Sequence, residues 1–231
     1  MSAGLQITLT LILLALVATV IFCPKLLRRL RRAKLMLQPP PPEWESILER
    51  NMNLYNELPP ELKVRLKALA AVFLNEKHFE ACGGISLNSE MKLIIAAEAS
   101  VLLLGRQKPS FFPTLDSILV YPDSFFSNER VRLGESMVEV EEESAEKLGE
   151  SWHSGSIILS WTHVKHEGNM LNDGVNVVYH EFAHQLDEEC GFADGFPSLE
   201  GSKMDYRQWS QLLSREHSSF VRDLKRGRRS P

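Results

Sequence analysis

The sequence predicts an α+β protein that is mostly helical, has a small mixed β-sheet, and is preceded by one transmembrane helix. Three observations support this prediction. An uncharged, apolar run occupies residues 5–23, and stretches with apolar residues at helical spacing follow between residues 43 and 104. Short β-rich runs are found only after residue 109, and a further helical stretch then carries two histidines four positions apart.

The composition is typical of a globular protein. The 231 residues are 44% hydrophobic and 24% charged. A formal net charge of −4 argues against direct nucleic acid binding. The three cysteines, Cys23, Cys82 and Cys190, are odd in number and widely spaced, so they predict no disulfide framework and suggest a reducing compartment.

Residues 1–24 are predicted to form a transmembrane anchor. At a rise of about 1.5 Å per residue, the apolar run approaches the roughly 30 Å hydrocarbon core. Basic residues follow the run, and none precedes it, so the positive-inside rule places the rest of the chain in the cytoplasm. A cleaved signal peptide is the alternative, but positive charge before the run and a small-residue cleavage site are both absent. The prediction is a single-pass membrane protein.

Residues 25–42 are expected to form a basic juxtamembrane segment and a Pro-rich linker, and residues 43–231 a folded domain. Asn88 is expected to cap one helix of that domain, and Pro60 to lie in the first turn of another. The predicted helices cover 43–56, 61–74, 91–104 and 206–224, and the predicted strands cover 117–121, 137–140 and 156–161.

The pentad His180-Glu181-Phe182-Ala183-His184 is the strongest candidate for chemistry. Successive helical residues turn by about 100°, so His180 and His184 lie one turn apart on nearly the same face. Two imidazoles at this spacing can bind one Zn²⁺, and Glu181 can take a proton from a water that attacks a peptide carbonyl. We therefore predict metal ligands at His180 and His184, a catalytic Glu181, a Zn²⁺ cofactor and a peptide substrate. The alternative is a core helix with two satisfied histidines and a solvated glutamate.

A wider set of motifs resembles the Mlc titration factor A family. The resemblance is densest over residues 174–187 and extends to Tyr121-Pro122-Asp123, to Gly149-Glu150-Ser151-Trp152 and to the apolar helix expected at 91–104. It implies a zincin-like metallopeptidase domain of the gluzincin type, with aminopeptidase activity, zinc on His180 and His184, and Glu181 as the base. It also implies a protein partner, a transcriptional repressor of the Mlc type.

The resemblance implies a third zinc ligand that this sequence does not contain. That ligand is a glutamate on a helix downstream of the pentad, beyond residue 231, so we expect the domain at 43–231 to be C-terminally incomplete. Asp187 and Cys190 follow the pentad and are weaker alternatives. Asp187 would reach the shared metal at a poor angle, and a ligand at Cys190 would need a glycine in place of Asp187 to turn the chain. Two functions stay open: an aminopeptidase-like zinc peptidase, and a weakly active or inactive protein that sequesters a repressor.

Overall fold

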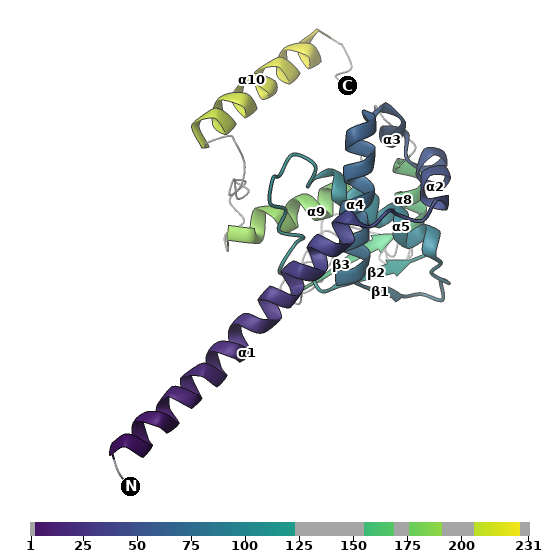
Figure 1. Cartoon of the computed structure of the whole chain (residues 1–231). Helices are drawn as coiled ribbons and strands as arrows, with labels where there is room; N and C mark the ends of the chain where they lie inside the picture. The colour runs from purple at the N-terminus through teal and green to yellow at the C-terminus, as the bar shows by residue number, and fades with distance from the viewer. Residues whose placement is uncertain (1–2, 123–154, 169–175, 191–205, 227–231) are drawn as a thin grey trace, which may run out of the picture. The chain divides into compact units, whose positions relative to one another are not determined.

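The computed structural model describes residues 3–122, 155–168, 176–190 and 206–226 (Figure 1). The strand expected at 137–140 lies outside these ranges. The chain divides into two compact units, Met1–Pro39 and Pro40–Pro231, which are described separately. The division falls in the Pro-rich segment, and the roles assigned to residues 25–42 and 43–231 remain predictions.

The first unit contains one long helix, α1 (Ala3–Leu37). Among the described residues, no helix combines the length and the apolar character that crossing a membrane requires. The predicted transmembrane helix and the predicted single-pass membrane localisation are therefore wrong. The helix α1 continues through Pro24 into the basic segment instead of ending with the apolar run.

The second unit is mostly helical. Asn88 accepts a hydrogen bond from the backbone N–H of Met91 at 2.8 Å, and Pro60 occupies the first turn of its helix, so both predicted helix starts are confirmed. The helix at Ser89–Val101, α5, is buried along nearly its whole length and packs against three other helices, which makes it the centre of the core. The first helices of this unit, in chain order, are α2 (Glu43–Asn51), α3 (Asn53–Glu57), α4 (Pro60–Glu76) and α5 (Ser89–Val101).

The sheet in the described part of the chain has three strands, in the order β1 (His78–Ala81), β2 (Ser117–Tyr121) and β3 (Ser156–Ser160). Both pairings are parallel, with His78 opposite Ser117 and Ser117 opposite Ser156. The predicted mixed sheet is therefore wrong for these strands. Parallel neighbours need a long crossover, and the segment containing α5 provides one between β1 and β2.

The buried face of the sheet continues the helical core. Alternate residues of β2 and β3 are buried, namely Ile118, Val120, Ile157 and Leu159, as the pleat requires. The helix α8 (Trp161–Glu167) follows β3 directly, and α9 (Val177–Asp187) contacts β3, α5 and α8. A short helix η1 (Glu188–Cys190) extends α9, and α10 (Tyr206–Lys225) comes last in the chain. The pentad thus lies on a helix that the core holds from several sides.

Candidate metal centre

The helix α9 carries the whole pentad, and its N-terminus is fixed by two side chains. Asn176 is the N-cap, and its Oδ1 accepts a hydrogen bond from the backbone N–H of Tyr179 at 2.8 Å. The Oε2 of Glu167, from α8, accepts one from the backbone N–H of Val177 at 2.5 Å. The first N–H groups of a helix have no partner within it, and its N-terminal dipole favours negative charge. The start of α9 is therefore well defined.

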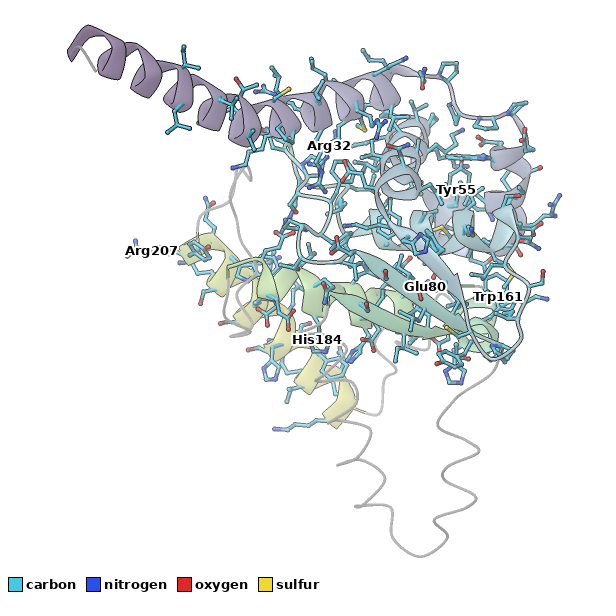
Figure 2. All side chains as sticks on the ribbon, turned by 90° about the horizontal axis from the view of Figure 1, so that it is seen from below. Arg32, Tyr55, Glu80, Trp161, His184 and Arg207 are labelled. Carbon is cyan, nitrogen blue, oxygen red and sulfur yellow. The ribbon has the colours of Figure 1, made fainter. Side chains whose placement is uncertain are left out.

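The two histidines of the pentad converge on one point in space. The Nε2 atoms of His180 and His184 lie 3.2 Å apart, with the ring planes at 88° to each other. Two nitrogens bound to one tetrahedral Zn²⁺ at about 2.0–2.1 Å would lie about 3.3–3.4 Å apart. The side chain of His180 is exposed and that of His184, labelled in Figure 2, is half-buried. The imidazole pair fits two positions of a tetrahedral zinc site.

Glu181 lies on the buried side of the same helix. Only 8% of this residue is exposed, and Val178, Phe182 and Gln185 are buried on the same side. This differs from the alternative expected from the sequence, in which the histidines belong to the core and the glutamate is solvated. Burying a carboxylate is costly unless its surroundings compensate, so this glutamate is not a surface residue placed by chance.

Phe182 anchors the pentad to the core. Its ring lies 4.8 Å from the ring of Phe112 and 5.5 Å from that of Phe73, between centroids. All three side chains are fully buried or nearly so. Such an aromatic cluster fixes the rotation of α9 about its axis, and this rotation decides which way the histidines point.

A third ligand is not assembled within the described residues. Across these ranges, no group of three or more His, Cys, Asp and Glu side chains is placed to hold a metal ion. Asp187, the last residue of α9, is in no such group with the histidine pair, and the side chain of Cys190 lies outside those described. The donors present fit zinc by type and spacing, but they make up only part of a catalytic site.

Sequence reasoning missed a buried carboxyl group beneath the metal helix. Glu98, in the middle of α5, is 0% exposed and faces the side chain of Asn176, the N-cap of α9. Burial raises the pKa of Glu98 to about 8, the contact with Asn176 opposes this, and the charge of Glu167 adds to it. Burial and the nearby Glu98 also raise the pKa of Tyr179. The signal in the sequence was a single acidic residue inside a continuous apolar run.

Glu98 makes stability depend on pH in a defined window. The folded state keeps a proton on Glu98 between pH 4.5 and about 8, where the unfolded chain has released it. The free energy of unfolding should therefore fall as pH rises through this window, at a limiting slope of about 1.4 kcal/mol per pH unit. Glu98→Gln should flatten this slope, as urea unfolding at several pH values would show. An unchanged slope in the variant would contradict the buried, protonated state.

Residues 27–230 match the family described as glucose-regulated metallo-peptidase M90. The chain belongs to this family. Within the M90 family, Mlc titration factor A of Escherichia fergusonii is 28% identical over 161 residues, which is 68% of this chain and 57% of the relative. The family resemblance expected from the motifs is thus confirmed, and with it a metallo-peptidase family and its implied metal.

Two further relatives define how far the M90 match extends. Mlc titration factor A of Salmonella arizonae is 28% identical over 159 residues, covering 68% of this chain and 60% of the relative. Uncharacterized protein slr2042 of Synechocystis sp. is 37% identical over 195 residues, covering 84% of this chain and 70% of the relative. The chain spans less than two thirds of the titration factors that it matches, so the activity of the whole M90 protein and its partners are matters for proposal.

Proposed function

We propose that this M90 protein is a zinc-dependent, aminopeptidase-like peptidase in which His180 and His184 bind the metal and Glu181 is the general base. The observation that carries the proposal is the 3.2 Å approach of the two Nε2 atoms on the helix that also buries Glu181. Two imidazoles and a glutamate on adjoining faces of one helix form a pattern with a known chemical use. The predicted substrate is a peptide.

His180, His184 and Glu181 have separate roles in the proposed hydrolysis. A bound Zn²⁺ supplies a Lewis acid that polarises the peptide carbonyl and makes a water more acidic. His180 and His184 would hold the metal through Nε2, and both rings would have to be neutral to do so. Glu181 accepts the proton of the attacking water and returns it to the leaving amine. Its buried position shields this transfer from bulk solvent.

Metal dependence tests the peptidase proposal. The full chain should release amino acids from short peptides, lose this activity when a chelator removes the metal, and regain it when Zn²⁺ is restored. Mass spectrometry of the products separates removal of the N-terminal residue from internal cleavage. Hydrolysis that continues at full rate in metal-free protein would overturn the proposal.

A second candidate is a binding protein that sequesters a transcriptional repressor. Two observations favour it: the described residues assemble no third ligand, and the relatives are named Mlc titration factor A. A binding protein would retain repressor binding in metal-free form and with Glu181→Gln, and its metal-loaded wild type would not hydrolyse peptides. Hydrolysis by the metal-loaded wild type therefore separates the candidates.

A further inference from the structure

The segment at residues 106–116 lies between α5 and β2. Hydrogen bonds from α4 and from Lys77, the residue after α4, hold this segment in place. Arg65 on α4 donates from Nε to the carbonyl of Leu104 at 3.0 Å and from Nη2 to the carbonyl of Arg106. Lys77, only 6% exposed, donates to the carbonyl oxygens of Phe112 at 2.6 Å and Leu115 at 2.5 Å. We refer to residues 106–116 as the clamp segment.

The backbone of the clamp segment is strained where it meets the pentad. Phe111 and Phe112 both have positive φ angles, of 60° and 51°. Residues other than glycine rarely have positive φ angles, and they keep this conformation only when the surrounding structure fixes it. Here the Lys77 ammonium group binds the carbonyl of Phe112 on one side, and the Phe112 ring packs on Phe182 on the other. This strained backbone conformation therefore places the ring of Phe112 against α9.

The clamp segment also binds the C-terminal end of that helix through Glu189. Arg106 Nη1 lies 2.5 Å from Glu189 Oε2 and 3.1 Å from Ser110 Oγ, and Ser110 donates a hydrogen bond to Glu189 Oε1. The side chains of Arg106 and Glu189 are 14% and 6% exposed. Both carboxylate oxygens of Glu189 are thus bound by one segment of the core.

This end of the helix bears directly on His184, which lies in the last turn of α9. The backbone N–H of Glu188 donates to the carbonyl of His184 and to that of Leu186, closing the turn. Helix ends fray unless they are held, and fraying here would free the His184 ring but not the His180 ring, one turn nearer the capped start. Glu189, next in the chain, ties this turn to the core, in addition to Gln185, whose Oε1 accepts a hydrogen bond from Thr114 Oγ1 at 3.5 Å.

We propose that Glu189 is a positioning residue, which through Arg106 and Ser110 holds the last turn of α9 so that the His184 ring stays aligned with the His180 ring. The zinc part of this inference rests on the function proposed above. A buried ion pair is seldom retained for stability alone, since apolar replacements of similar volume are often at least as stable. Its directional bonds fix one orientation of the helix end, which apolar contacts do less well.

The test compares Glu189→Gln with Glu188→Gln, the same substitution one residue earlier at a half-exposed position. In metal-free full chain, Glu189→Gln should make amide hydrogen exchange at residues 187–190 about tenfold faster, because a hydrogen-bonded charge is lost. It should also weaken Zn²⁺ binding about tenfold in a chelator competition, as loss of a group that orients a ligand does. Glu188→Gln should leave both quantities within about twofold of wild type.

The two measurements have separate consequences. Wild-type exchange rates and zinc affinity in Glu189→Gln would overturn the positioning role, as would equal changes in Glu188→Gln. If the wild-type chain binds no zinc, the proposed function fails, and the exchange rates alone still decide whether Glu189 holds the helix end. If Glu189→Gln does not fold, the double variant Arg106→Met/Glu189→Leu replaces the pair without leaving a lone charge. It should fold and show the same faster exchange, and slow exchange in it would refute the role.

Discussion

Glu181→Gln is expected to lower the rate of peptide hydrolysis by about 100- to 10,000-fold, the usual contribution of a general base. The amide keeps the shape of the side chain but cannot accept the proton of the attacking water. Zinc should remain bound, because the two imidazoles are untouched. Single-turnover assays with a peptide substrate, together with zinc content by atomic absorption, measure the two effects in the same sample.

The matched control for this substitution is Glu188→Gln, which makes the same chemical change seven residues further along the chain. Its hydrolysis rate should stay within about twofold of wild type, since the turn at Glu188 is closed by its backbone N–H, which the substitution keeps, and its side chain is half-exposed. A Glu181→Gln protein that keeps most of its activity would refute the assignment of Glu181 as the base. A protein that loses its zinc as well would show that Glu181 has a structural role at the metal.

Phe182→Ala is expected to lower the free energy of unfolding by about 3–5 kcal/mol, the usual range for removing a buried phenylalanine. Phe182 is 0% exposed and contacts the rings of Phe73 and Phe112, so its loss leaves a cavity beneath the pentad. Urea unfolding followed by circular dichroism gives the free energy. An unchanged slope against urea would show that the same unfolding transition is being compared.

Val64→Ala is the control for the loss of apolar side-chain atoms. Val64 is on α4 and is 65% exposed, so this variant should change the free energy of unfolding by no more than about 0.5 kcal/mol. A change below about 1 kcal/mol for Phe182→Ala would mean that the aromatic cluster does not hold α9 in place. The account of how the pentad is positioned would then be wrong.

Features determined by local sequence were predicted well. The metal helix, the Asn88 cap and the Pro60 helix start depend on spacing and on capping chemistry within a few residues. The placement of the two histidines on one face follows from the helical period alone. These features can be deduced from sequence because the chain need not fold back on itself to produce them.

Features that depend on contacts between distant segments were missed. The strand β1 has four residues, and only Phe79 is partly buried. Its sequence therefore lacks the alternation of apolar and polar residues that predicts a strand. Its parallel pairing with β2 became visible only from the register of the two strands. The bond between Arg106 and Glu189 joins residues 83 positions apart, and nothing local to either residue indicates the partner. The predicted membrane span was wrong, since no helix among the described residues has the length and apolar character to cross a membrane.

The zinc content of the purified full chain decides whether α9 holds a metal ion. We expect about one zinc ion per wild-type chain, and a loss of that zinc in His184→Ala with the fold retained, because one of the two converging imidazoles is gone. Asn176 caps the helix in both proteins, so the comparison isolates the metal site. A wild-type chain that folds, yet takes up no zinc at micromolar protein and excess metal, would contradict the account and favour the binding-protein alternative.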